Sequence, residues 1–197
     1  MTARIAPLDD TGQSDAQVQL DELLSFLGYR PNALFTMARK PGLLSAVLQM
    51  VHVALRGPGL LDPALRFLVA CEACRGAGCF YSAVHVVHAT HHLGVSWEKL
   101  AALDSAACSP LFTAAERAAL QLAAAGATLP VGPAHAAFDE AARHYSPDEL
   151  LEIVGATALF GWFNRWNSLI GSELEDEPAT VLNRVPWLSR MRRQDSE

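Results

Sequence analysis

The chain has 197 residues, of which 51% are hydrophobic and 18% are charged. This length and composition exclude a disordered polypeptide and predict one compact, helix-rich domain with a substantial core. A formal net charge of −6 argues against nucleic acid and anionic membranes as partners. The first residues lack the apolar core of a signal peptide and no apolar run is long enough to span a bilayer, so we expect a cytoplasmic protein.

Nearly every segment predicts helix, because apolar residues recur at intervals of three and four and cap residues precede them. In chain order, the expected helices run from Ser14 to Leu27, after Pro31, from Pro41 to Arg56, from Asp62-Pro63 to about Gly76, from about Cys79 to Leu93, after Ser96, after Thr113, and from Ser146 to about Ile170. Thr113 and Ser146 each precede a glutamate by three residues, which is the pattern of a capping box. No run alternates with the period of a strand, and the predicted fold class is all-α.

No segment has the composition of a domain linker. The Pro/Gly-rich stretch at 128–133 is interpreted as a connection between helices, and the sequence from Asn183 onward as a solvated tail. We therefore expect a single helical domain over residues 1–182, followed by a C-terminal extension over residues 183–197.

The most informative stretch is CEACRGAGCFYSAVHVVHATHHLG, residues 71–94, which holds three of the four cysteines and four of the seven histidines. It predicts two helices joined by a Gly-rich turn. Cys79 follows this turn and lies at the start of its helix, where free amides and the helix dipole stabilise a thiolate. Cys74 lies late in the preceding helix and suits a resolving or structural role. The alternative is that Cys79 is a buried, inert thiol, since cysteine often packs as a small hydrophobic residue.

Helix geometry predicts which of these side chains meet. Ser82 is three residues from both Cys79 and His85 and is expected to neighbour both, whereas Cys79 and His85 are separated by roughly 9 Å along the axis. His85, His88 and His92 share one side of the helix, but ligands spread over three turns do not converge on one ion without a further ligand. We therefore expect no metal and no organic cofactor, and interpret the histidines as interface side chains.

The last long helix contains LFGWFNRWNSLIG, with aromatic residues on more than one face around Asn164, Arg165 and Asn167. This pattern favours a helix buried in the core or in a subunit contact. An aromatic wall of a substrate pocket is the alternative interpretation.

These features together resemble the carboxymuconolactone decarboxylase and alkylhydroperoxidase-D-like superfamily, in particular its peroxidase-related members. The resemblance covers roughly Leu20 to Glu177 and rests on LGYRPNALFTMARKPGLLSAVLQM, LLDPALRFLVACEACRGAGCFYSAVH, LFTAAERAAL and YSPDELLEIVGATALFGWFNRWNSLIGSELE. It implies an all-helical fold and a homo-oligomer, a trimer or a multiple of trimers. It also implies reduction of organic hydroperoxides through a cysteine pair with the help of a thiol reductant.

Within this resemblance, Cys79 matches the first motif cysteine, and Ser82 occupies the position of the peroxide-attacking cysteine. His85 fits the motif histidine. The usual place of the relay glutamate falls at Phe67, and Glu72 is the nearest acidic substitute. Because a serine hydroxyl does not cycle through sulfenic acid and disulfide, the two-cysteine mechanism is not available in its usual form.

The first hypothesis is a thiol-dependent peroxidase with Cys79 as nucleophile, Ser82, His85 and Glu72 as further catalytic residues, and Cys74 or an outside thiol resolving the sulfenic acid. The alternative is a non-redox member of the same superfamily whose pocket serves small-molecule binding or a lyase-type, decarboxylase-like reaction. A third interpretation is a structural subunit without chemistry. Rapid alkylation of Cys79 near neutral pH would favour the first hypothesis.

Overall fold

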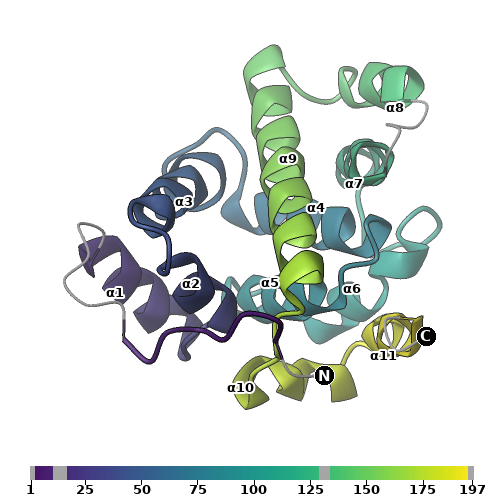
Figure 1. Ribbon diagram of the computed structural model, residues 1–197. Coiled ribbons are helices and arrows are strands. Elements are labelled where there is room, and N and C mark those ends of the chain that lie inside the picture. Colours follow the sequence, from purple (N-terminus) through teal and green to yellow (C-terminus); the bar gives the residue numbers. More distant parts are fainter. Residues whose placement is uncertain (1–2, 11–16, 129–133, 195–197) are drawn as a thin grey trace.

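The computed structural model describes residues 3–10, 17–128 and 134–194, and every regular element in these ranges is a helix (Figure 1). The elements are α1 (Gln17–Leu27), α2 (Asn32–Met37), α3 (Leu43–Val51), a π-helical turn (His52–Arg56), α4 (Pro63–Gly76), α5 (Phe80–His92), α6 (Trp97–Ala101), a 3-10 turn (Leu103–Ser105), α7 (Ala114–Ala127), α8 (Ala134–Ala141), α9 (Pro147–Ile170), α10 (Asp176–Ala179), a second 3-10 turn (Thr180–Asn183) and α11 (Pro186–Gln194). The all-α prediction is confirmed.

Helix α4 is the centre of the fold, because its residues from Arg66 to Cys74 are buried on every side. It packs against α5, α7 and α9. Figure 1 shows the long α9 crossing in front of α4, with α5 below them. The turn from α4 into α5 therefore carries the start of α5 into the interior of the molecule.

The expected helix ends are set by caps that the structure contains. Asp62 accepts a hydrogen bond from the Ala64 amide over 2.8 Å at the start of α4. Thr113 and Ser146 each form a capping box with the glutamate three residues later. Gly171, with a φ of 65°, ends α9. The predicted cap Ser14 and most of the predicted connection at 128–133 lie outside the described residues.

The C-terminal segment corrects the sequence interpretation. Val185, Trp187 and Leu188 are buried, and the Trp187 indole donates to the Leu100 carbonyl oxygen over 2.9 Å. Helix α11 packs against α5 through this apolar side, while Arg190 on the same helix is exposed. The solvated-tail interpretation was wrong because Trp187, Leu188 and Met191 give this short helix a buried apolar side.

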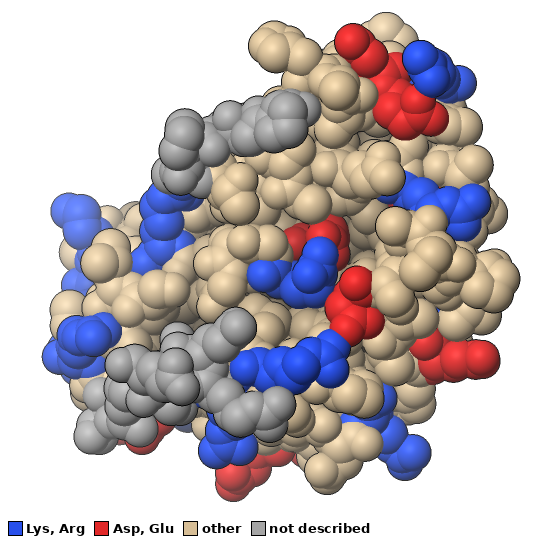
Figure 2. Space-filling model, turned by 90° about the vertical axis from the view of Figure 1, so that its right-hand side faces the viewer, with Lys and Arg blue, Asp and Glu red and all other residues tan. Residues whose placement is uncertain are grey.

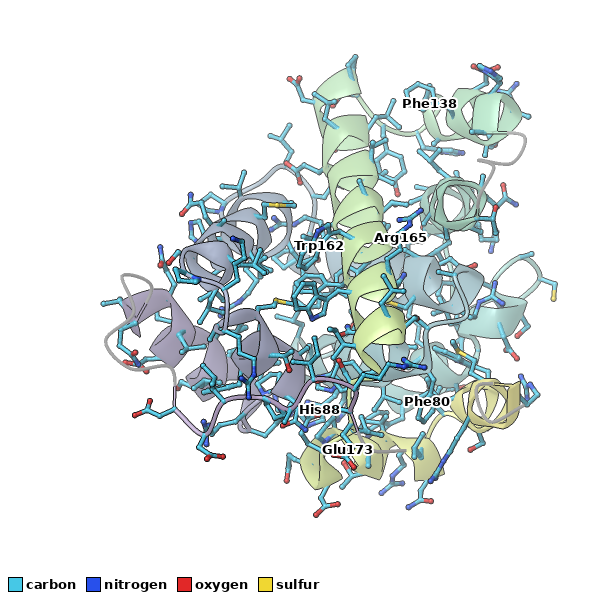
Figure 3. All side chains as sticks on the ribbon, in the orientation of Figure 1. Phe80, His88, Phe138, Trp162, Arg165 and Glu173 are labelled. Atoms are coloured by element: carbon cyan, nitrogen blue, oxygen red, sulfur yellow. The ribbon has the colours of Figure 1, made fainter. Side chains whose placement is uncertain are left out.

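Helix α9 is covered on two sides. Figure 3 shows Trp162 directed toward α3 and Arg165 directed toward α7. Trp162 stacks on Trp166 at 5.5 Å and borders a hollow with Met50 and Val53. This arrangement explains the aromatic residues on more than one face of the helix.

The face of the molecule shown in Figure 2 carries positive and negative side chains next to one another. Contacts of this kind include the ion pairs Arg75–Glu72 and Arg190–Asp104. None of the described helices combines the length and the apolar character needed to cross a membrane.

Candidate active site

A mostly apolar cavity of about 110 Å³ lies between α1, the π-helical turn, α5 and α9. Polar side chains also line it, namely Tyr29, Arg56, Tyr81, Ser82, His85 and Asn167. An apolar cavity with a few convergent polar groups is the usual form of a small-molecule site. The aromatic residues Phe160 and Phe163 of α9 are part of its wall, as the second interpretation of this helix expected.

Cys79 lies next to this cavity but does not line it. It is the N-cap residue of α5 and follows Gly78, whose φ of 70° favours glycine. Its side chain is 4% exposed, and its thiol donates to Ser82 Oγ over 3.2 Å. Cys79 and Ser82 are in contact, as the sequence predicted. Ser82 lies between the sulfur atom and the cavity.

Ser82 is held by a residue of α9. The Asn167 side-chain amide donates to Ser82 Oγ over 3.0 Å, and its oxygen accepts from the Ser172 hydroxyl over 3.0 Å. Ser82 and Asn167 are both buried. The described hydrogen bonds of Ser82 thus go to Cys79 and Asn167, and the expected bridge from Ser82 to His85 is not among them.

His85 contacts two residues that lie far from it in the sequence. Its Nε2 is 2.7 Å from Glu175 Oε2, and its Nδ1 is 2.7 Å from the Tyr29 hydroxyl. The other carboxylate oxygen of Glu175 accepts from the Tyr81 hydroxyl over 2.9 Å and from the Asn32 amide over 2.5 Å. A continuous line of contacts therefore runs from Tyr29 at the cavity wall through His85 to Glu175.

The charges in this line are set by burial and by neighbouring groups. Burial acts to raise the pKa of Glu175, but the His85 contact and charge and the Asn32 amide outweigh it and lower that pKa. Burial, followed by the negative charge of Glu175, raises the pKa of Tyr29, and the same two causes raise the pKa of Tyr81. At neutral pH the carboxyl group is ionised and both phenols keep their protons.

Glu72 and Cys74 lie on α4 with other partners. Glu72 accepts two hydrogen bonds from the Arg75 guanidinium, over 2.8 and 2.5 Å, and borders a second hollow with Asp104 and Arg117. Its described contacts do not include Cys79 or His85. Cys74 is fully buried, and its carbonyl oxygen accepts from the Cys79 amide over 3.2 Å. Burial, followed by the nearby thiols, raises its pKa well above the ordinary cysteine value.

The remaining histidines of α5 face different neighbours. The His91 ring stacks on Trp97 at 3.6 Å, and His92 Nδ1 lies 3.2 Å from the Phe26 carbonyl oxygen. His88, labelled in Figure 3, is buried, and burial followed by the other histidines lowers its pKa to about 4. Within the described ranges, no three His, Cys, Asp or Glu side chains are grouped so that they would hold a metal ion.

The sequence analysis did not identify Tyr29, Tyr81 or Glu175 as site residues. Tyr29 and Glu175 lie in connections outside the helices, 56 and 90 positions from His85, and no spacing rule links them to it. Tyr81 is one residue from Ser82, but a tyrosine inside an apolar helix is usually a core residue. Asn167 was visible only as a polar residue among aromatic ones.

One protein-family model matches part of this chain. A model described as the carboxymuconolactone decarboxylase family matches residues 41–125, which contain the α4–α5 hairpin. Among curated proteins no match was found.

Several solved structures have the same fold. The apo debrominase Bmp8 is 29% identical over 93% of this chain and 98% of its own, with a TM-score of 0.83. A cysteine-to-alanine variant of Bmp8 in complex with 2,3,4-tribromopyrrole is 28% identical over 93% and 97% of the two chains, with a TM-score of 0.85. An AhpD-core, peroxidase-related protein from Ralstonia eutropha JMP134 is 21% identical over 93% and 99%, with a TM-score of 0.74. At 21% identity the similarity supports the fold alone.

Proposed function

We propose that this chain, whose residues 41–125 match the carboxymuconolactone decarboxylase family, is a small-molecule enzyme in which Tyr29 donates a proton to a ring held in the cavity. The observation that carries the proposal is the line of contacts from Tyr29 through His85 to Glu175. This corresponds to the lyase-type alternative of the sequence analysis.

Each member of the line has a distinct role. Tyr29 is the proton donor, because it lines the cavity and its phenol is in the protonated form at neutral pH. After the transfer, protonated His85 returns a proton to the phenolate through Nδ1, 2.7 Å away. The ionised Glu175 stabilises the imidazolium, and Tyr81 and the Asn32 amide hold the carboxylate in place. The arrangement is that of a general acid whose hydroxyl is oriented and reprotonated by a histidine, which is in turn stabilised by a carboxylate.

The proposed substrate is a compact ring with little polar surface. The cavity is small and mostly apolar, with Phe26, Phe67 and Phe163 in its wall. The similar protein Bmp8 was solved with 2,3,4-tribromopyrrole, a heteroaromatic ring of this kind. The same molecule is therefore a suitable first probe for this chain.

Exchange of the one carbon-bound hydrogen of 2,3,4-tribromopyrrole for deuterium in D₂O tests the proposal. Tyr29 adds a deuteron to the ring carbon, and His85 returns a deuteron to the phenolate. The ring then releases its own proton to the solvent, His85 regains a deuteron from D₂O, and mass spectrometry records a gain of one deuterium. We expect the wild type to accelerate the exchange and Tyr29→Phe to slow it by about 100-fold or more. Cys79→Ser is the control and should retain the rate. Equal rates for the wild type and Tyr29→Phe would contradict the proposal.

A second candidate is the thiol-dependent peroxidase of the first hypothesis. It is supported by the hydrogen bonds from Asn167 to Ser82 and from Cys79 to Ser82. If the Cys79 thiol ionises, the Ser82 hydroxyl turns to donate to the thiolate while it still accepts from Asn167. The thiolate would attack a hydroperoxide, releasing the alcohol and leaving a sulfenic acid. A thiol, from Cys74 or an added reductant, would then form a disulfide and release water.

Turnover of cumene hydroperoxide with dithiothreitol as reductant tests this candidate. Cys79→Ser should abolish turnover, whereas Cys108→Ser should leave it unchanged, because Cys108 is exposed and its thiol donates to the Ser105 carbonyl oxygen, away from Cys79. Unchanged turnover in Cys79→Ser would exclude the candidate.

The expected homo-oligomer is also retained as a proposal. It is supported by exposed apolar side chains on α3, the π-helical turn and α9, among them Met50, Val53, Leu151 and Val154. Light scattering of the wild type and of Val53→Glu tests it. A larger particle that dissociates on substitution is expected, and a monomeric wild type would contradict it.

A further inference from the structure

Arg56 lines the cavity, and the proposed function gives it no role. It is half-buried, and its guanidinium carbon lies 4.7 Å from the centre of the Phe26 ring, which also lines the cavity. Burial lowers its pKa, and the exposed Glu22 of α1 partly offsets this effect through space. Arg56 forms no hydrogen bond or ion pair with another described residue.

Other partly or fully buried arginines of the molecule use their donors within the protein. Arg66 donates to the Gly57 carbonyl oxygen, Arg75 to Glu72, and Arg117 to the Ser109 and Phe112 carbonyl oxygens. A guanidinium has five N–H donors, and those of Arg56 are not among the buried side-chain atoms without a partner, so they stay accessible beside the cavity. The contrast indicates that the partner of Arg56 is a molecule from outside the chain.

The backbone beside Arg56 is held rigidly. Residues His52–Arg56 form a π-helical turn, closed by a 2.6 Å hydrogen bond from the Gly57 amide to the His52 carbonyl oxygen. A Cβ at Gly57 would lie 2.6 Å from the same oxygen, so no other residue fits there without a shift. The Gly57 carbonyl oxygen accepts from Arg66, which is 2% exposed. Single π turns of this kind often occur at functional sites.

We propose that the natural ligand of the cavity is a small aromatic carboxylate, and that Arg56 is the specificity-determining residue that binds its carboxylate group. The proposal rests on the proposed function, because it names the substrate class of the same cavity. A guanidinium matches a carboxylate with two parallel hydrogen bonds, and the apolar wall accepts the ring. The carboxylate end binds at Arg56, while Tyr29 and His85 supply the acid at another part of the wall.

Titration calorimetry with pyrrole-2-carboxylate and its neutral analogue pyrrole-2-carboxamide tests the assignment. The wild type should bind the carboxylate at least about tenfold more tightly than the amide. In Arg56→Gln the two ligands should bind equally, and Arg56→Lys should keep only part of the preference, since a lysine lacks the fork of donors. The matched control Arg39→Gln should behave as the wild type, because Arg39 is an exposed residue that donates to the Ala6 carbonyl oxygen away from the cavity.

Equal binding of the two ligands by the wild type, absence of binding, or an unchanged preference in Arg56→Gln would overturn the proposal. Tyr29→Phe separates this result from the proposed function. It should keep the preference for the carboxylate while losing deuterium exchange. A variant that loses deuterium exchange but still prefers the carboxylate therefore tests the role of Tyr29. A variant that loses the preference for the carboxylate but keeps deuterium exchange tests the role of Arg56.

Discussion

Glu72 and Glu175 both keep their side chains mostly out of solvent, yet their surroundings shift their pKa values in opposite directions. At Glu72 burial is the largest effect and raises the pKa against the opposing influence of Arg75. At Glu175 burial also acts to raise the pKa, but the contact with His85 and the Asn32 amide outweigh it and lower the pKa. The comparison teaches that the number and orientation of donors, rather than burial alone, decide in which direction the pKa of a carboxyl group in the interior shifts.

The same comparison explains why the acidic residue nearest to Cys79 in the sequence is not the one at the cavity. Glu72 lies on the central helix, whose register directs it to Arg75 and to the hollow it borders with Asp104 and Arg117. Glu175 follows the end of α9 and reaches His85 although the two residues are 90 positions apart in the sequence. The position at which the superfamily resemblance expects a glutamate holds Phe67, which is part of the apolar wall.

The largest expected effect is on proton transfer. Glu175→Gln should slow deuterium exchange of 2,3,4-tribromopyrrole by about 100-fold, because the imidazolium of His85 loses the charge that stabilises it. The matched variant Glu72→Gln should stay within about twofold of the wild-type rate, since Glu72 has no contact with the line of residues from Tyr29. Slow deuterium exchange in Glu72→Gln together with a wild-type exchange rate in Glu175→Gln would mean that Glu72, and not Glu175, supports the proton transfer.

A smaller effect is expected on folding stability. Glu72→Ala should lower the free energy of unfolding by about 1–2 kcal/mol, because it leaves the partly buried Arg75 without its partner. Glu140→Ala is a control with the same spacing, since Glu140 pairs with the exposed Arg143 three residues later. It should change the free energy by about 0.5 kcal/mol or less. Urea unfolding of both variants measures the difference, and equal losses would show that burial of the Glu72 pair has no consequence.

The smallest effect is on the pH dependence of stability, where the two glutamates should have opposite signs. Glu175, whose pKa is lowered on folding, contributes stability above the ordinary glutamate pKa near 4.5 and loses it as the pH falls through its folded value. Glu72, whose pKa is raised, binds its proton more tightly in the folded state, so its contribution declines as the pH rises from about 4.5 to its folded value. For each glutamate, the free energy of unfolding should change by at most about 1.4 kcal/mol per pH unit.

Urea unfolding between pH 3 and 7 separates the two contributions. The difference between wild type and Glu175→Gln should grow as the pH rises, and the difference between wild type and Glu72→Gln should shrink. If both differences in the free energy of unfolding changed with pH in the same direction, the pKa values of Glu72 and Glu175 would not be shifted in opposite directions.

Much of the fold was predictable from local patterns. The capping boxes at Thr113 and Ser146 and the Gly171 stop fixed the ends of α7 and α9, because these signals involve residues within one helical turn. The contact between Cys79 and Ser82 was predictable for the same reason. The packing of α11 was not predicted, since Trp187 and Leu188 are only two apolar residues among several arginines and their burial depends on the surface of α5.

The sequence by itself determined helices α1 to α7 and α9, their order and the placing of Cys79, Ser82 and His85 on one helix, because these depend on interactions between residues a few positions apart. Only the tertiary structure decided that Ser82 binds Asn167, that His85 meets Tyr29 and Glu175, and that Glu72 pairs with Arg75 on another side of α4. The packing angles of α9 and α1 against α5 bring together residues up to 90 positions apart, and nothing in a local pattern encodes these angles.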